Sequence, residues 1–302
     1  MSAPAPVETW THADSRIAFR AVLNGTACVY PGSVYDPISA RIAQDIGFEI
    51  GMFAGSIASM TVLGAPDLIV LTLSEFADQA GRICRASPLP LMVDADHGYG
   101  NALSVQRTVE ELERAGVSGM SIEDTLLPRP FGDEERTELL SIDEGIGKMK
   151  AAVAARKERE IGQAISIFGR TSALAVTGVA DCIARAKAYE AAGVDAIFLV
   201  GAKSRADVEA VAAEISLPIM LGGVGPDMQD REYLAGLGVR ICLQGHQPFM
   251  AAFQAVHDTL KALRDGVDPK TLKGLPSADL VKRVTRGADY DARTASFLTK
   301  SG

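Results

Sequence analysis

The 302-residue sequence predicts an α/β protein, a (β/α)8 TIM barrel with a helical extension at its C-terminus. Three observations support this fold class. Eight apolar runs of strand length alternate with longer segments in which apolar residues recur with helical spacing. Several runs, such as residues 196–200, are apolar throughout, as strands covered on both faces should be. Glycine phrases such as Ala192-Gly193-Val194 recur between a helix and the next strand, where glycine commonly ends a helix.

The expected strands and helices alternate along the chain without a break in composition. The strands are predicted at residues 26–31, 48–53, 90–94, 118–122, 164–169, 195–200, 217–221 and 239–243. The helical patterns lie at 37–46, 73–86, 101–115, 142–158, 178–192, 205–214, 228–236 and 247–264. Such a series favours a closed barrel over an open doubly wound sheet. The first strand is not followed by Gly-x-Gly-x-x-Gly, which further disfavours a dinucleotide-binding sheet.

Two segments fall outside this repeating pattern. Residues 124–141 make an unusually long connection from a strand to a helix, of the kind that serves as a lid. The C-terminal tail can form helices at 276–284 and 288–299, and these must pack against something. We therefore expect a single domain over residues 1–302, with the barrel at about 20–265 and the tail at about 266–302.

Charge and hydropathy exclude several classes of partner. The formal net charge is −8 and the isoelectric point is about 5.1. These values disfavour nucleic acid and anionic membrane surfaces, because both need clustered Lys and Arg. No segment approaches the roughly 18 apolar residues of a membrane span. The first eight residues have neither the basic start nor the apolar core of a secretion signal. We expect a soluble, cytoplasmic protein.

The four cysteines are widely spaced along the chain, at Cys28, Cys84, Cys182 and Cys242. None belongs to a Cys-x-x-Cys pair, so the sequence suggests neither a zinc site nor a disulfide framework. Cys28 and Cys242 lie inside apolar runs of strand length. We expect buried free thiols, which fit a reducing compartment.

Acidic residues follow two neighbouring strands at the point where each strand ends. Asp94 and Asp96 close the third strand, and Glu123 closes the fourth. Because the carboxyl ends of parallel strands meet at one mouth of a barrel, these side chains should lie close together. Hard cations such as Mg²⁺ take carboxylate oxygens and keep several waters. The pattern predicts a hard-cation site, although either aspartate alone could instead cap the following helix.

Other polar residues end the second, fifth and eighth strands and should share that mouth. Ser56 follows the second strand, Arg170 ends the fifth and His246 follows the eighth. The planar fork of Arg170 could hold a substrate carboxylate, or it could neutralise the acids. His246 could contact a substrate, or it could be a hydrogen-bonded structural residue. His97 is open to the same structural interpretation, although it lies beside the acidic pair.

Several of these strings resemble the isocitrate lyase and phosphoenolpyruvate mutase superfamily. The matching strings are Ala54-Gly55-Ser56, Asp94-Ala95-Asp96-His97-Gly98-Tyr99-Gly100, Ser121-Ile122-Glu123-Asp124 and Gly169-Arg170-Thr171. The resemblance extends from about residue 20 to 265 and includes the helical tail. It implies a barrel in which Mg²⁺, for which Mn²⁺ could substitute, binds the keto and carboxylate oxygens of a small α-oxo acid. It also implies subunits that exchange their last helix and assemble as a dimer of dimers, a homotetramer.

The resemblance implies a role for each polar residue at the mouth. Asp94 is the direct metal ligand, and Asp67, Asp96 and Glu123 act mainly through water. The residues implied to bind the substrate are Gly55, Ser56, Ile57, Arg170 and His246. Arg170 and His246 are also the implied catalytic residues.

The lid departs from the pattern of the carbon–carbon lyases of that superfamily. Those enzymes carry Lys-Arg/Lys-Cys-Gly-His there, with the Cys as an acid/base group, whereas this chain reads Leu127-Pro128-Arg129-Pro130-Phe131-Gly132. The mutase and the phosphonopyruvate hydrolase use an Asn or Thr near the same place, and this stretch offers none before Thr137. With Asp-His-Gly-Tyr-Gly-Asn, Glu-Asp-Thr-Leu-Leu-Pro and a final Gly-His, the closest resemblance is to the oxaloacetate decarboxylase branch.

That branch implies Mg²⁺-dependent decarboxylation of oxaloacetate to pyruvate and CO2 through a metal-stabilised enolate. Two alternatives stay open. The chain could be a lyase or hydrolase that cleaves a C–C or C–P bond in a related oxo acid, such as 2-methylisocitrate or phosphonopyruvate. It could also be a non-catalytic barrel that binds oxo acids.

Overall fold

A computed structural model describes residues 10–132, 136–156 and 163–298 of the chain. The first eight residues, lid positions 133–135, and the expected helix ends at 157–158 and 299 lie outside these ranges. Within them, the four cysteines are free and buried, as expected. None of the described helices has the length and apolar character needed to cross a membrane.

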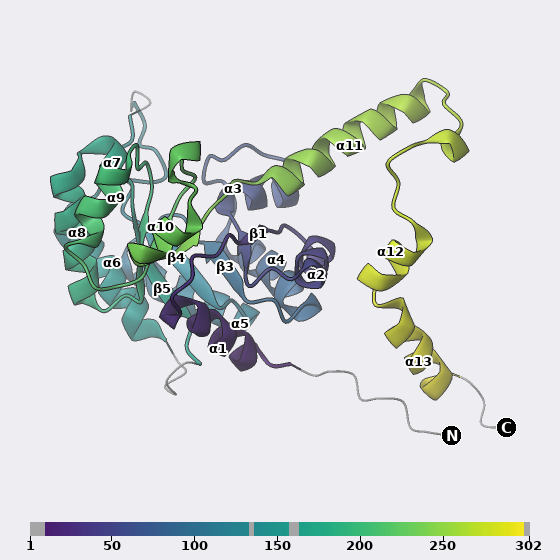
Figure 1. Ribbon diagram of the computed structural model, residues 1–302, viewed down its shortest axis with the longest axis horizontal. Coiled ribbons are helices and arrows are strands. Elements are labelled where there is room, and N and C mark those ends of the chain that lie inside the picture. The colour runs from purple at the N-terminus through teal and green to yellow at the C-terminus, as the bar shows by residue number, and fades with distance from the viewer. Residues whose placement is uncertain (1–9, 133–135, 157–162, 299–302) are drawn as a thin grey trace.

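Eight parallel strands form one sheet in which each strand pairs with the next along the chain (Figure 1). They are β1 Gly32–Ser33, β2 Gly51–Phe53, β3 Leu91–Asp94, β4 Gly119–Glu123, β5 Ser166–Thr171, β6 Ala196–Leu199, β7 Ile219–Leu221 and β8 Val239–Cys242. A parallel bridge between Val29 and Ile241 joins the first strand region to the last. The sheet therefore curls back on itself, and the predicted (β/α)8 class is confirmed.

The expected first strand, residues 26–31, is wrong in its bounds. Only Val29 of that run bridges to β8, and the ladder with β2 begins at Gly32, which pairs with Gly51. Pro31 separates the two pairings. Because proline has no backbone N–H to donate, it interrupts a ladder at that point.

The helices that follow the strands match the expected segments to within a few residues, although α10 begins later than expected. They are α2 Pro37–Ile46, α4 Leu73–Ala86, α5 Ala102–Ala115, α6 Ile142–Ala155, α8 Val179–Ala192, α9 Arg205–Ala212, α10 Arg231–Gly236 and α11 Gln247–Arg264. Short helical turns, most of them in loops, are α3 Gly55–Ala58, η1 Ser59–Leu63, α7 Ala173–Val176, η2 Pro226–Met228 and η3 Pro269–Thr271. Gly116 and Gly193 end α5 and α8 with φ of 96° and 92°, a conformation that favours glycine.

A helix that we did not expect, α1 His12–Asn24, lies against the amino ends of the strands. The Arg16 guanidinium is buried and donates from Nε to the Val117 carbonyl at 3.1 Å. The Phe19 ring is fully buried and meets Phe168 edge-on, with ring centroids 6.0 Å apart. A Cβ atom added at Gly119 would lie 2.6 Å from the Phe19 ring, so β4 must carry glycine there. The helix closes this end of the barrel.

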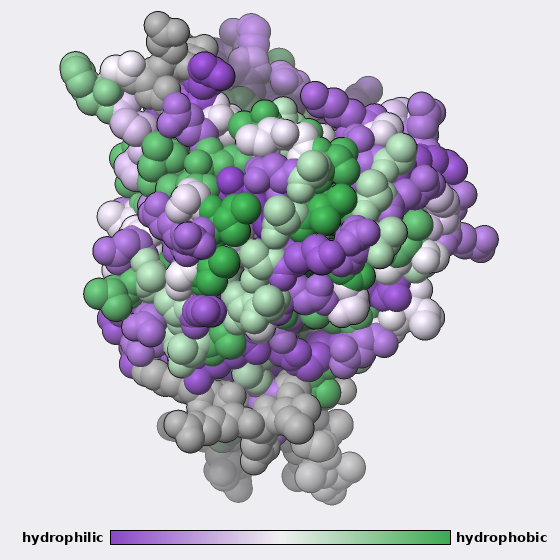
Figure 2. Space-filling view, turned by 90° about the vertical axis from the view of Figure 1, so that its left-hand side faces the viewer, coloured by the Kyte–Doolittle hydropathy of each residue, from purple (hydrophilic) through white to green (hydrophobic). Residues whose placement is uncertain are grey.

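The tail leaves the barrel along α11, which projects into solvent (Figure 1). No residue of α11 is buried. The tail then returns as α12 Ala278–Val284 and α13 Gly287–Phe297. Arg286 holds this return to α2 through ion-pair contact with Asp45 at 2.7 Å. On the outer surface beside α8 and α9, hydrophilic and hydrophobic residues are interspersed (Figure 2).

Candidate active site

One cavity of about 350 Å³ opens where the carboxyl ends of the strands meet. Seven residues predicted from the sequence line it: Ser56, Asp67, Asp94, Asp96, Glu123, Arg170 and His246. Two others, Gly55 and Ile57, do not line the cavity, and the Ile57 side chain is buried in the core. His97 is also buried and lies outside the lining. The structure thus brings the predicted carboxylates, arginine and imidazole into one space.

Arg170 joins the acidic residues of β3 and β4. Its Nη1 donates to Asp94 Oδ2, and its Nη2 lies 3.5 Å from Glu123 Oε2. Ser121 donates to the other Asp94 oxygen at 2.8 Å, and Thr125 donates to Glu123 Oε2 at 2.5 Å. These bonds hold both carboxylates in fixed orientations.

Asp96 depends on a close approach between two loops. Its φ is 48°, in the left-handed region that Asp tolerates better than most residues. A Cβ atom added at Gly55 would lie 2.5 Å from Asp96 Oδ1, so the carboxylate fits only against glycine. Gly55 therefore contributes space for Asp96.

The acidic side chains raise one another's pKa. Burial raises the pKa of Asp96 well above its ordinary value, and the charges of Asp94 and Glu123 raise it further. Burial also raises the pKa of Glu123, against the opposing effect of Arg170. The pKa of Asp67 rises through desolvation and the charge of Asp94. Burial would lower the pKa of Arg170, but Asp94 and Glu123 raise it above its ordinary value, so this side chain stays charged.

The donor chemistry of this cavity fits a hard cation that keeps part of its water shell. The oxygens are carboxylates, and their mutual repulsion would be relieved by added positive charge. Within residues 10–132, 136–156 and 163–298, no group of three or more His, Cys, Asp or Glu side chains has the arrangement of a metal site by itself.

His246 follows β8 and is held by the end of β1. Its Nδ1 lies 2.9 Å from Ser33 Oγ, which leaves Nε2 to meet a ligand in the cavity. Burial lowers the pKa of His246, and Asp94 only partly offsets this. The imidazole is therefore neutral at pH 7, a form that can donate or accept a hydrogen bond.

Sequence reasoning missed several residues that complete the cavity. Arg129 and Leu127 reach it from the lid, and Phe198 and Val200 form an apolar wall at the end of β6. The Arg170 guanidinium carbon lies 5.4 Å from the centroid of the Phe198 ring. Arg129 carried one usable signal, a lone cation between two prolines in the lid. The apolar residues carried none, because any barrel strand can end in Phe or Val.

Three comparisons relate the chain to known proteins. The model of a family described as phosphoenolpyruvate phosphomutase matches residues 19–264. A protein named oxaloacetate decarboxylase from Bradyrhizobium diazoefficiens is 58% identical over 283 residues, covering 94% of this chain and 96% of the relative.

Two solved structures share the fold at lower identity. Oxaloacetate acetylhydrolase with the inhibitor 3,3-difluorooxalacetate has a TM-score of 0.81 at 28% identity, covering 96% of this chain and 99% of that one. Phosphonopyruvate hydrolase with oxalate and Mg²⁺ has a TM-score of 0.80 at 28% identity, covering 94% and 99%.

Proposed function

Because this chain belongs to the phosphoenolpyruvate phosphomutase family, we propose that it is a carboxy-lyase that converts oxaloacetate to pyruvate and CO2. The family predicted from the sequence motifs is thereby confirmed. The observation that carries the proposal is the 58% identity to an oxaloacetate decarboxylase across nearly the whole chain. The cavity supports it with an acidic ring, a half-buried arginine and an apolar wall.

The cofactor that we propose is Mg²⁺, with Mn²⁺ as a substitute. Asp94 would contact the ion directly, and Asp67, Asp96 and Glu123 would hold it mainly through water. The carboxylate chemistry of the cavity supports this, as does the complex of phosphonopyruvate hydrolase with oxalate and Mg²⁺. When bound, the ion supplies positive charge that stabilises the enolate left by loss of CO2.

Arg170 and the loop after β2 would orient the C1 carboxylate of the substrate. The Nε atom of Arg170 is buried and has no hydrogen-bond partner among the described residues, so the guanidinium keeps a donor for a ligand. The backbone N–H groups of Ser56 and Ile57 lie in the first turn of α3, where helical N–H groups lack partners within the helix. Fixed donors of this kind orient a carboxylate before reaction and need no rearrangement during it.

His246 and the apolar wall would act on the carboxylate that leaves. A neutral imidazole is a poor proton donor, so its lowered pKa favours a hydrogen bond to the C4 carboxylate over protonation of the enolate carbon. Leu127, Phe198 and Val200 exclude water from part of the cavity. An apolar environment favours release of neutral CO2 from a charged carboxylate.

The test measures CO2 released from oxaloacetate by the purified protein with Mg²⁺, after subtraction of the release caused by Mg²⁺ alone. We expect a clear excess that Asp94→Ala abolishes. Asp78→Ala is the matched control, because Asp78 is an exposed acid on α4 that pairs with Arg82 outside the cavity. No excess over free Mg²⁺ would contradict the proposal.

The same assay separates the alternative functions. A higher kcat/KM with 2-methylisocitrate or phosphonopyruvate would assign the chain to a C–C or C–P lyase or hydrolase. Tight oxalate binding without turnover of any oxo acid would indicate a binding protein. The described structure gives no support for a thiol-dependent lyase, because all four cysteines are buried and none lines the cavity.

We also propose that the protein assembles through its tail, as a dimer of dimers with exchanged helices. The support is α11, which exposes a row of apolar residues, namely Met250, Phe253, Val256, Leu260 and Leu263. Such a row at helical spacing needs a covering surface. The four unpaired thiols support a cytoplasmic location, because thiols stay reduced there.

A further inference from the structure

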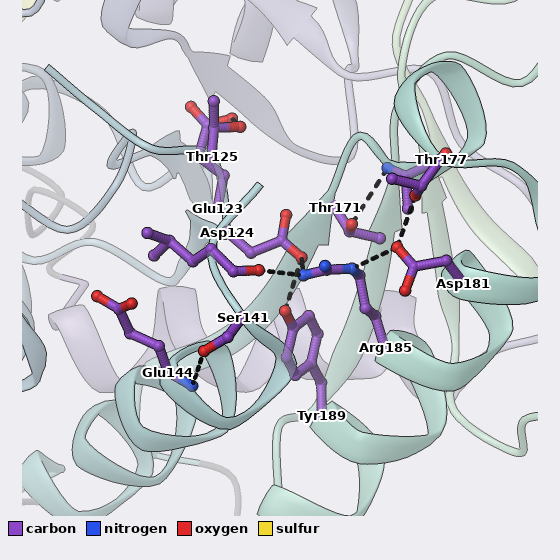
Figure 3. A network of polar contacts seen from close by, with 12 residues as sticks. Glu123, Asp124, Thr125, Ser141, Glu144, Thr171, Thr177, Asp181, Arg185 and Tyr189 are labelled. Atoms are coloured by element: carbon purple, nitrogen blue, oxygen red, sulfur yellow. Dashed lines mark hydrogen bonds and ion pairs between the residues drawn. The ribbon is translucent and has the colours of Figure 1, made fainter. Parts of the chain in front are cut away.

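Behind Glu123, a buried network joins α8 to the residue that starts the lid (Figure 3). Asp124 is fully buried directly after Glu123. Its Oδ2 accepts a hydrogen bond from Arg185 Nη1 at 3.0 Å and another from the Tyr189 hydroxyl at 2.6 Å. A buried carboxylate needs such partners, because desolvation without them would be costly.

The Arg185 guanidinium also reaches the far end of the lid. The same Nη1 donates to the Leu140 carbonyl at 2.9 Å. Its Nε donates to Asp181 Oδ2 at 2.8 Å, and Thr177 donates to that same oxygen at 2.6 Å. Arg185 therefore contacts the first residue of the lid and a residue near its end, while Asp181 orients the guanidinium from its own helix.

The two stems of the lid are paired to each other at this point. Leu140 N–H donates to the Asp124 carbonyl at 2.8 Å, and Leu126 N–H donates to the Glu138 carbonyl at 2.9 Å. Residues 124–126 and 138–140 thus form a short antiparallel pair, and Arg185 holds its base. Leu127 and Arg129, which line the cavity, follow this pair directly.

The network also touches the backbone of the active-site strands. Asp124 N–H donates to the Arg170 carbonyl at 3.2 Å. A Cβ atom added at Gly169 would lie 3.0 Å from Tyr189 Cδ2, so the ring packs against the residue that precedes Arg170. The side chains of α8 therefore contact the lid stems and the backbone next to Glu123 and Arg170.

We propose that Arg185 is a positioning residue that holds the lid stems, so that the cavity-lining part of the lid keeps its place over the substrate. Arg185 does not line the cavity and touches no reacting atom. The guanidinium donates from Nη1 to Asp124 and Leu140 while its Nε donates to Asp181, and the single nitrogen of a lysine cannot reproduce donors at these two separate positions. This role adds a positioning residue to the proposed decarboxylase, and only its expected effect on the kinetics rests on that proposed function.

Limited trypsin digestion tests the proposal without any activity measurement. The lid contains one cleavable bond, after Arg136, because Arg129 precedes proline. Arg185→Lys and Arg185→Met should loosen the stems, so that the lid opens more often. Trypsin should then cleave after Arg136 about tenfold faster than in the wild type. Lys187→Met is the matched control, because Lys187 lies on the same helix and pairs with Glu214 at the surface.

The pattern of cleavage separates local loosening from general instability. We expect cleavage after Arg136 to rise relative to cleavage after Lys203 and Arg205, which lie outside the lid. An unchanged Arg136 rate in a folded Arg185→Lys protein would overturn the proposal. An equal rise at all these sites would also overturn it, because Arg185 would then serve only overall stability.

Kinetics give the second readout. In Arg185→Lys, KM for oxaloacetate should rise about tenfold, whereas the inhibition constant of oxalate should change less than about threefold. Oxalate is short and lacks the distal carboxylate that would lie nearest the lid. Equal weakening of both ligands would place the damage at the metal site and overturn the lid role. If the wild-type protein does not decarboxylate oxaloacetate, the digestion result still decides whether Arg185 holds the lid.

Discussion

Arg170 determines how much negative charge the cavity can hold. It bonds Asp94, approaches Glu123 and remains charged, yet it neutralises only one of the surrounding carboxylates. Burial is the main cause of the raised pKa values of Asp96, Glu123 and Asp67, and the negative charge of neighbouring carboxylates raises them further. A substrate dianion would add to this repulsion, so the cavity needs further cations near its opening.

Arg129 supplies such a charge from the lid. It lines the cavity and has no ion-pair partner among the described residues. Arg129→Gln should raise KM for oxaloacetate about tenfold, because a charge-assisted hydrogen bond to the distal carboxylate is lost. Steady-state kinetics should show kcat unchanged or slightly higher, because that carboxylate loses its charge as CO2 forms.

The control for this change lies on the same lid. Arg136 is exposed and does not line the cavity, so Arg136→Gln should leave both constants within about twofold of the wild type. A tenfold fall in kcat with unchanged KM in Arg129→Gln would instead place Arg129 in the chemical step.

Buried thiols make stability sensitive to alkali. Burial raises the pKa of Cys84 to about 12, whereas an unfolded thiol ionises near pH 8.5. The stabilising contribution is complete below about pH 8 and is lost as the pH rises toward the folded pKa, because only the unfolded chain ionises there. In urea unfolding between about pH 9 and 11, the free energy of unfolding of the wild type should fall by about 1.4 kcal/mol more per pH unit than that of Cys84→Ala. Parallel losses in the two proteins would show that Cys84 does not titrate as its burial implies.

The sequence predicted the charged site residues better than their neighbours. Asp94, Glu123, Arg170 and His246 each end a strand region or follow one, so strand topology alone placed them together. Ser33 and Ser121 could not be assigned, because their roles depend on bonds to His246 and Asp94 that only the folded chain shows. The function of Arg185 was equally hidden, since its partners lie 61 and 45 residues away in the sequence.

At the level of elements, the secondary structure expected from the sequence was wrong at two places: a helix that buries polar residues, and a strand region interrupted by proline. The α1 helix buries Ser15 and Arg16 beside Phe19, so its inward face lacks a continuous apolar pattern. A pattern search reads such a segment as a polar lead-in. At β1, Pro31 divides one apolar run into two separate pairings.

The α1 helix should contribute to stability without affecting catalysis. Phe19 is fully buried at the end of the barrel opposite the cavity, where it meets Gly119 and Phe168. Phe19→Ala should lower the free energy of unfolding by about 3–5 kcal/mol, through lost burial and the cavity left behind. Chemical denaturation measures this, and kcat/KM of the folded variant should stay near the wild-type value.

Ile17 offers the matched control on the same helix. Its side chain is 49% exposed, so Ile17→Ala should change the free energy of unfolding by less than about 0.5 kcal/mol. A loss of activity in Phe19→Ala at temperatures where the protein stays folded would show that the two ends of the barrel are coupled.

For the whole molecule, the repeated strand-helix unit made the barrel predictable, and the tail helices α12 and α13 lie close to their expected positions, but the surface that covers the tail could not be predicted. Each barrel helix finds its partner in the neighbouring unit, so local patterns suffice to assign it. The tail helices lie outside this repeat, although the return at α12 and Arg286 contacts α2. Their apolar residues indicate that a surface must cover them, but the spacing of residues in one chain does not identify that surface.

The tail should therefore determine the oligomeric state. Phe253, Val256, Leu260 and Leu263 recur at alternating steps of three and four residues, which places them on one face of α11. Phe253 and Leu260 are 66% and 62% exposed, an unfavourable state for a monomer in water. We expect light scattering after size exclusion to give the mass of a tetramer, and the double change Phe253→Glu with Leu260→Glu to reduce it, because buried unpaired charges oppose association. Gln254→Glu, on the polar side beside Asp258, should keep the wild-type mass. A monomeric wild type, or a double variant of unchanged mass, would mean that α11 is not the assembly element.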